Sequence, residues 1–431
     1  MRTGIEPIDP YVPERGNAGY DARHYDLDLD YTISSNHLRG RALIHVDVVE
    51  DLARLDLDLV GLRATKVKVD GRPARWRQSS GKLRITPASP VAAGRSITIE
   101  VRYDGTPGPT RSTWGPVGWE ELTDGILVAA QPTGAATWFP CNDLASQKAS
   151  FDLRVTTATP YRVVANGTLV DRRNGATTST WTFHQGEPTS PYLMTLNLGR
   201  YEERTLPSSP VPMRLLASGE DMPSVVEAFR RQPEMMDVFI DRFGPYPFDA
   251  GYTAVVCPEP LEVPLEAQGQ AIFGTNHLDP DYERLIAHEL SHQWFGNSIT
   301  AERWRDVWLH EGFACYAEWI WSEASGGETA DDLARHHHAR LSGLPQDLLL
   351  GDPGPVDMFD DRVYKRGALT VHVLRRQMGD DAFFDLLRTW TAEHRHGLIT
   401  TAGFEALLAA SDPSLVTLLR RWLDELALPD L

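Results

Sequence analysis

Long apolar segments are absent from this sequence of 431 residues. No stretch approaches the roughly 20 consecutive apolar residues that a membrane-spanning helix needs. The first residues, MRTGIEPIDPYVPERG, also lack the apolar core of a secretory signal peptide. We therefore expect a protein that has no membrane partner and is not exported.

Cysteine is scarce as well. The three cysteines, Cys141, Cys257 and Cys315, lie far apart in the sequence, and no two of them form a CxxC pair. An odd number of cysteines at such spacings argues against a disulfide scaffold and against a cysteine-based zinc site. A reducing, cytoplasmic location fits this composition.

Basic residues are outnumbered, because 42 Lys and Arg stand against 60 Asp and Glu, which gives a net charge of −18. Nucleic-acid binding needs clustered Lys and Arg, so we predict no nucleic-acid partner. The acidic excess can steer cationic ligands, although we interpret it mainly as an aid to solubility. No long heptad pattern appears, and the oligomeric state stays unknown at this stage.

The first half of the chain alternates apolar with polar residues, which is typical of half-buried antiparallel strands. The clearest sets are Leu27, Leu29, Tyr31 and Ile33; Leu55, Leu57 and Leu59; and Ile97, Ile99, Val101 and Tyr103. Turn-forming pairs such as Asp70-Gly71 separate them. A chain of 431 residues is too long for one typical hydrophobic core. We therefore predict an all-β domain at residues 1–203 and a second domain at residues 204–431, where helical spacing prevails.

A candidate metal site lies in the second domain. Residues 288–292 read His-Glu-Leu-Ser-His, within a helix that we expect to end at Gly296. Residues four apart lie on the same helix face, so His288 and His292 can bind one metal ion together. Glu289 lies one step around the helix, from where it can reach a metal-bound water without becoming a ligand.

A third ligand is predicted on the next helix. Glu311 follows His292 with eighteen residues between them, and an antiparallel helix pair can bring its carboxylate to the same metal ion. Two histidines and one carboxylate leave a fourth position open for water, as catalytic zinc sites require. Zinc suits these nitrogen and oxygen ligands. The alternative for His288 and His292 alone is a pair of surface histidines on an ordinary helix.

Several segments resemble the gluzincin zinc aminopeptidases, the family of aminopeptidase N and leukotriene hydrolase. They are His-Glu-Leu-Ser-His-Gln-Trp-Phe-Gly-Asn at 288–297, Trp-Leu-His-Glu-Gly-Phe-Ala at 308–314, Trp-Phe-Pro-Cys-Asn-Asp at 138–143, Phe-Gly-Pro-Tyr-Pro-Phe at 243–248 and Tyr-Lys-Arg-Gly-Ala at 364–368. His310 stands where the family usually has asparagine. The resemblance implies an N-terminal all-β, saddle-like domain followed by a thermolysin-like, mainly α-helical catalytic domain.

The resemblance also implies a function, the hydrolysis of N-terminal residues from peptide substrates. One zinc ion per chain is then held by His288, His292 and Glu311. Glu289 takes a proton from the zinc-bound water and passes it to the leaving amine. Tyr364 donates a hydrogen bond to the oxyanion of the tetrahedral intermediate.

An aminopeptidase must also bind the free α-amino group of its substrate. The family's Gly-Ala-Met-Glu-Asn motif corresponds here to Val-Pro-Leu-Glu-Ala at 263–267, in which Glu266 is retained. A carboxylate near an ammonium group is the physically necessary part. Gln131 matches the family's second anchor, with a spacing to Pro140 one residue shorter than expected, and the alternative is an ordinary loop glutamine.

Other interpretations remain open at this stage. The same site suits a zinc endopeptidase or an epoxide hydrolase, and a non-catalytic zinc-bearing scaffold that binds peptides is a further alternative. Glu318, seven residues after Glu311, is either a partner of a ligating histidine or a solvated helix charge. Helical patterns at 365–426 complete the catalytic domain. We therefore expect a short form without the family's helical C-terminal domain, with an open cleft that tolerates substrates of varied length.

Overall fold

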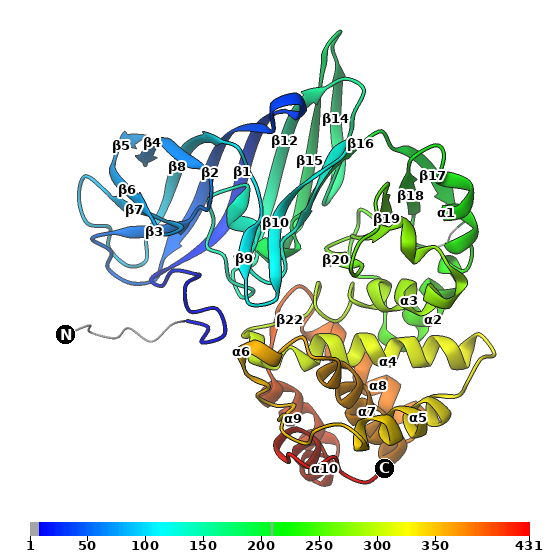
Figure 1. The fold of residues 1–431 in the computed structure, drawn as a ribbon. Coiled ribbons are helices and arrows are strands. Elements are labelled where there is room, and N and C mark those ends of the chain that lie inside the picture. The colour runs from blue at the N-terminus through cyan, green and yellow to red at the C-terminus, as the bar shows by residue number, and fades with distance from the viewer. Residues whose placement is uncertain (1–7, 208–209) are drawn as a thin grey trace. The chain divides into compact units, whose positions relative to one another are not determined.

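The computed structural model describes residues 8–207 and 210–431, which divide into two compact units between Glu202 and Glu203 (Figure 1). In the described residues, the first unit consists of strands joined by turns and short 3-10 helices, and every α-helix lies in the second unit. This order confirms the prediction of an all-β domain followed by a mainly α-helical one.

The largest sheet of the first unit has eight strands, which pair antiparallel except for the parallel pair β1 and β12. In sheet order they are β14 (Thr168–Asn174), β15 (Thr178–Thr189), β12 (Ala149–Ala158), β1 (Tyr20–Thr32), β2 (His37–Val48), β8 (Ser96–Gly105), β4 (Arg63–Val69) and β5 (Arg72–Pro73). The predicted alternation holds in β1, where Leu27, Leu29 and Tyr31 are buried. At the β4–β5 hairpin, Asp70 and Gly71 have φ values of 47° and 73°, as the tight hairpin turn predicted there requires.

Two smaller sheets complete the first unit. One contains, in sheet order, β13 (Arg162–Ala165), β16 (Leu196–Gly199), β11 (Gly125–Ala129), β10 (Gly115–Leu122) and β9 (Thr110–Ser112), and the other contains β3 (Leu55–Asp58), β7 (Lys82–Thr86) and β6 (Arg75–Ser79). Their apolar faces join those of the large sheet in one core, which includes the fully buried rings of Trp119, Trp138 and Trp181.

The second unit begins with a sheet that the sequence pattern did not indicate. Its strands, in sheet order, are β17 (Glu202–Leu206), β18 (Met213–Ala217), β19 (Tyr252–Cys257), β21 (Gln270–Gly274) and β20 (Leu265–Ala267). Strands β18, β19 and β21 run parallel, and β20 pairs antiparallel at the edge. All six residues of β19 are buried, so this strand shows no alternation that a sequence pattern can detect.

Among the described residues, ten α-helices follow or interrupt this sheet. They are α1 (Met222–Ala228), α2 (Gln232–Phe243), α3 (Glu283–Ser291), α4 (Trp308–Ala324), α5 (Ala330–Ser342), α6 (Gly354–Asp357), α7 (Asp361–Met378), α8 (Asp380–Glu393), α9 (Thr401–Ser411) and α10 (Pro413–Asp424). Helices α3 and α4 lie between the sheet of this unit and the helices nearer the C-terminus (Figure 1). Among the described residues, none of these helices combines the length and the apolar character needed to cross a membrane.

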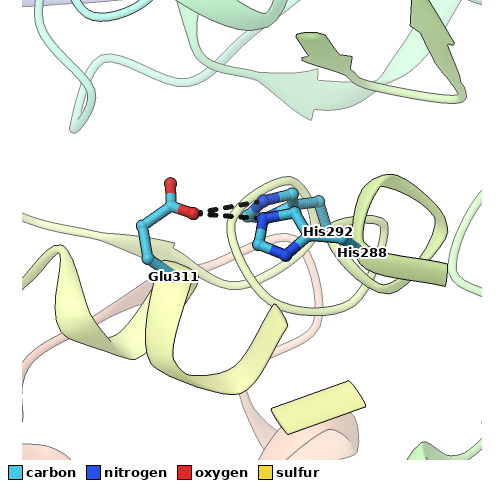
Figure 2. A group of neighbouring side chains, drawn as sticks. All are labelled: His288, His292 and Glu311. Carbon is cyan, nitrogen blue, oxygen red and sulfur yellow. Dashed lines mark ion pairs between the residues drawn. The ribbon is translucent and has the colours of Figure 1, made fainter. Parts of the chain in front are cut away.

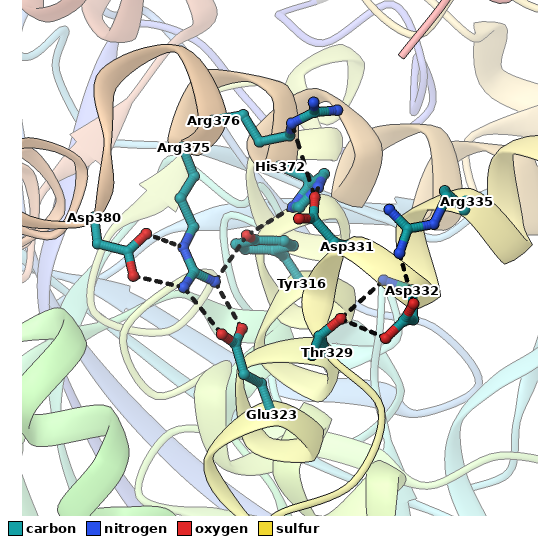
Figure 3. Close-up of polar contacts among 10 residues, drawn as sticks. All are labelled: Tyr316, Glu323, Thr329, Asp331, Asp332, Arg335, His372, Arg375, Arg376 and Asp380. Carbon is teal, nitrogen blue, oxygen red and sulfur yellow. Dashed lines mark hydrogen bonds and ion pairs between the residues drawn. The ribbon is translucent and has the colours of Figure 1, made fainter.

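Helices α4 and α7 pack closely against each other. Gly312 of α4 faces Gly367 of α7, and a Cβ atom built on Gly367 would lie 2.6 Å from the Cα atom of Gly312. Farther along the same helices, Tyr316, His372 and Arg375 belong to a polar network that also includes Asp331 of α5 (Figure 3). The two helices are therefore joined by a backbone contact at one point and by hydrogen bonds at another.

Candidate metal centre

Helix α3 places the two histidines one turn apart. The prediction that this helix runs to Gly296 is wrong, because its last residue is Ser291. His292 still has helical angles, φ −57° and ψ −21°, and its N–H donates to the carbonyl of His288 at 3.2 Å. After His292 the chain turns back, so that the N–H of Asn297 donates to the carbonyl of His292 at 3.0 Å.

Glu311 of α4 meets both histidines (Figure 2). Its Oε2 atom lies 3.4 Å from Nε2 of His288 and 3.5 Å from Nε2 of His292, and all three side chains are buried. A tetrahedral zinc ion with bonds of about 2.1 Å separates its ligand atoms by about 3.4 Å. The spacing of the three atoms therefore fits one zinc ion bound between them.

The remaining nitrogen of each ring has an acceptor. Nδ1 of His288 donates to Oε1 of Glu318 at 2.9 Å, and Nδ1 of His292 donates to the carbonyl of Phe295 at 2.9 Å. Because these oxygens accept, the proton of each neutral ring is on Nδ1, and the lone pair of Nε2 points towards Glu311. Of the two roles considered for Glu318, the structure places it as the partner of a histidine.

The charges around the rings favour a cation. Burial lowers the pKa of His288, but the carboxylates of Glu311 and Glu318 more than offset this effect and raise the pKa to about 9. Burial also lowers the pKa of His292, and Glu266 and Glu311 raise it to about 10. Positive charge is thus stabilised here despite burial, and a divalent metal ion would take the place of the protons.

Two further glutamates border the three ligand atoms. Glu266, Glu289 and His292 each offer one atom within 4.8 Å of the others. Among the described residues, Oε2 of Glu289 is buried and has no hydrogen-bond partner. Burial raises the pKa of Glu289 to about 8, against the lowering effect of the two histidines, and the carboxylate of Glu266 adds to the rise. Glu266 is half-buried in the edge strand β20.

Tyr364, in the first turns of α7, completes this cluster. Its ring centroid lies 6.1 Å from that of His288, with an angle of 20° between the ring planes. Burial raises the pKa of the Tyr364 phenol, and the carboxylates of Glu311 and Glu266 raise it further. The phenol therefore keeps its proton at neutral pH and can donate a hydrogen bond.

Gln131 belongs to the first unit. It is half-buried in the loop between β11 and the 3-10 helix η2 (Ala135–Thr137). His310, the residue that departs from the family pattern, is buried, and its Nε2 atom accepts from the N–H of Ala301 at 2.7 Å. The imidazole of His310 therefore holds the chain beside α4 in place.

Two cationic residues near Glu318 were not anticipated from the sequence. Nη1 of Arg284 lies 3.1 Å from Oε2 of Glu318, and Nζ of Lys365 lies 3.6 Å from the same oxygen. The available signals were that Arg284 lies four residues before His288 and that Lys365 directly follows Tyr364. Neither spacing is informative until the packing of α3, α4 and α7 is known.

Two paired helices that carry His-Glu-x-x-His and a glutamate at zinc-ligand spacing define a gluzincin-type metallopeptidase fold. Residues 21–193 match the Peptidase M1 N-terminal domain, and residues 228–422 match the Peptidase family M1 domain. The chain is 30% identical to an M1 zinc metallopeptidase of Deinococcus radiodurans, solved with a Tyr-Ser-Ala substrate, with a TM-score of 0.90 and 99% of each chain covered. The chain belongs to peptidase family M1.

Other relatives are aminopeptidases. A leucyl aminopeptidase of Saccharolobus solfataricus is 25% identical over 83% of this chain and 47% of its own length. A glutamyl aminopeptidase of Bos taurus is 23% identical over 94% of this chain and 46% of its own length. The chain thus spans about half the length of the curated relatives it matches. Membership of a family of zinc metallopeptidases implies one catalytic zinc ion, which fits the ligand geometry above.

Proposed function

We propose that this chain is a zinc-dependent aminopeptidase that removes N-terminal residues from peptides. The observation that carries the proposal is the cluster itself. Three ligand atoms have the spacing of a tetrahedral zinc site, and two carboxylates that are not needed as ligands, those of Glu289 and Glu266, lie beside them. The naming of the relatives as aminopeptidases supports the same conclusion.

In this proposal His288, His292 and Glu311 hold the metal ion. Zinc bound there supplies a Lewis acid that activates water and polarises the scissile carbonyl. With a divalent cation bound there, Glu289 would be ionised at neutral pH. It would accept the proton of the attacking water at Oε2, which is buried and has no hydrogen-bond partner among the described residues. Glu289 then passes the proton to the leaving amine. The phenol of Tyr364 donates a hydrogen bond to the oxyanion that develops on the substrate.

Recognition of the free N-terminus is assigned to Glu266 and Gln131. The Glu266 carboxylate would make a charge-assisted hydrogen bond to the substrate's ammonium group, and its strand β20 lies at the edge of the sheet. Gln131 would supply a second acceptor through its side-chain oxygen. We also propose a cytoplasmic location, because Cys141, Cys257 and Cys315 are all buried thiols.

The test compares peptides with free and acetylated N-termini, using a panel of aminoacyl fluorogenic amides with and without a chelator. We expect turnover of the free amines only, with loss of turnover on chelation and recovery with zinc. The Glu289→Gln variant should retain zinc and lose about 10²- to 10⁴-fold in kcat. If the acetylated peptides are cleaved as fast as the free ones, the exopeptidase assignment is wrong and an endopeptidase is indicated.

A further inference from the structure

Glu318 is a buried carboxylate whose two oxygens have different partners. Its side chain is 6% exposed. Oε1 accepts from Nδ1 of His288 at 2.9 Å, while Oε2 faces the cations of Arg284 and Lys365. A buried carboxylate is costly unless opposite charges and hydrogen bonds compensate it. The orientation of His288 therefore depends on what holds Glu318.

Arg284 and Lys365 are unequal partners of this carboxylate. The side chain of Arg284 is 52% exposed, so solvent screens its charge and its ion pair contributes little. The side chain of Lys365 is only 12% exposed. Its ammonium group also donates to Sγ of the buried Cys315 at 3.0 Å. Cys315 lies one turn before Glu318 on α4, so this second contact helps to fix the ammonium group beside Glu318.

The ammonium group of Lys365 thus connects three helices. Glu318 and Cys315 belong to α4, the helix that also carries Glu311. Lys365 belongs to α7 and directly follows Tyr364. Glu318, which pairs with Lys365, also accepts a hydrogen bond from His288 of α3.

We propose that Lys365 is a positioning residue of the metal centre, which fixes Glu318, and through it the ring of His288, in the orientation that binds zinc. Partners that orient a ligating histidine typically contribute about 10- to 100-fold to metal affinity. Among the described residues, the polar partners of Lys365 are Glu318 and Cys315, so it would act on the metal ion through Glu318. The proposal rests on the metal site described above but not on peptide hydrolysis.

The experiment measures zinc affinity of the full chain by competition with a chromophoric chelator. We expect Lys365→Met, which keeps an unbranched side chain and removes the charge, to weaken zinc binding by about 10-fold or more. Arg376→Met is the matched control, because Arg376 lies on the same helix, is 54% exposed and pairs with Asp331 at 3.8 Å. Its zinc affinity should equal that of the parent.

A second arm shows whether Lys365 acts through Glu318. In the Glu318→Gln background, Lys365→Met should change zinc affinity by less than about twofold, as expected when one residue works through the other. Parent-like affinity of Lys365→Met would overturn the proposal, and so would an equal loss in both backgrounds. If Lys365→Met does not fold, Lys365→Gln, which keeps a donor for Cys315 without the charge, is subject to the same two criteria. Peptide turnover does not enter either criterion, so the result stands apart from the proposed aminopeptidase activity.

Discussion

The contact between Gly312 and Gly367 leads to a quantitative prediction. A Cβ atom at position 367 would lie 2.6 Å from Cα of Gly312 and 3.3 Å from its backbone nitrogen, whereas ordinary contact begins at 3.4 Å. The atoms in the way belong to the backbone and cannot rotate aside. In a Gly367→Ala variant, α4 and α7 must therefore move apart, by up to 0.8 Å if the contact relaxes from 2.6 to 3.4 Å.

This separation acts directly on the proposed active site. Gly312 follows Glu311, and Gly367 lies one turn after Tyr364. A misplacement of about 1 Å costs on the order of 10²-fold in rate, so we expect kcat/KM to fall by about 10- to 100-fold. Overpacking costs about 1–3 kcal/mol, and replacing a helical glycine by alanine returns about 1 kcal/mol. The net change in the free energy of unfolding is then a loss of up to about 2 kcal/mol.

The assay combines kcat and KM on an aminoacyl amide, the midpoint of thermal unfolding and the bound zinc content. Gly403→Ala in α9 is the matched control, because its new Cβ would meet Thr400 and Trp390 at 3.4 and 3.5 Å. That variant should keep its activity and gain up to about 1 kcal/mol in the free energy of unfolding. A Gly367→Ala protein with a higher midpoint of thermal unfolding and unchanged kcat/KM would refute the reasoning, since it would show that the two helices accommodate the added methyl group without moving apart.

Two further predictions concern buried histidines. His310→Gln should keep the stability of the parent, because the longer amide can reach the N–H of Ala301, whereas His310→Asn should lose about 1–3 kcal/mol of unfolding free energy; equal denaturation midpoints for the two variants would contradict this. Burial lowers the pKa of His372, although Asp331 opposes the shift (Figure 3). The folded state then binds fewer protons than the unfolded state below about pH 6.5. The free energy of unfolding therefore decreases as the pH is lowered through that range. Thermal midpoints between about pH 7 and pH 5 should drop more in the parent than in His372→Gln, and parallel curves would count against the argument.

Local periodicity explains which parts of this protein were predictable. The alternation of Leu27, Leu29 and Tyr31 survives as one buried face of β1, because a half-buried strand repeats every two residues. The pair His288 and His292 was recognisable because a helix repeats its face after four residues. The end of α3 was not, because the chain leaves the helix at Ser291 and turns so that Phe295 can accept from His292.

The features missed by sequence reasoning depend on packing. Strand β19 is buried on both faces, and its continuous apolar run has no strand period. Gly312 and Gly367 are distant in the sequence, and their contact can be recognised only once the packing of α4 against α7 is known. The same holds for Lys365, whose partners Cys315 and Glu318 lie on another helix. The role of Gln131 stays a prediction.

The charges of the cluster support the proposed exopeptidase activity over an endopeptidase. The negative charge of Glu318 is compensated by Lys365 and Arg284. The other three carboxylates, those of Glu266, Glu289 and Glu311, face the site, with a total charge of −3 when ionised. A zinc ion neutralises two of these charges, and a substrate with a free ammonium group neutralises the third. A substrate with a blocked N-terminus would instead leave one half-buried carboxylate without a counter-charge, which is unfavourable. Charge balance and the position of Glu266 beside the metal ligands therefore both support the proposed preference for free N-termini.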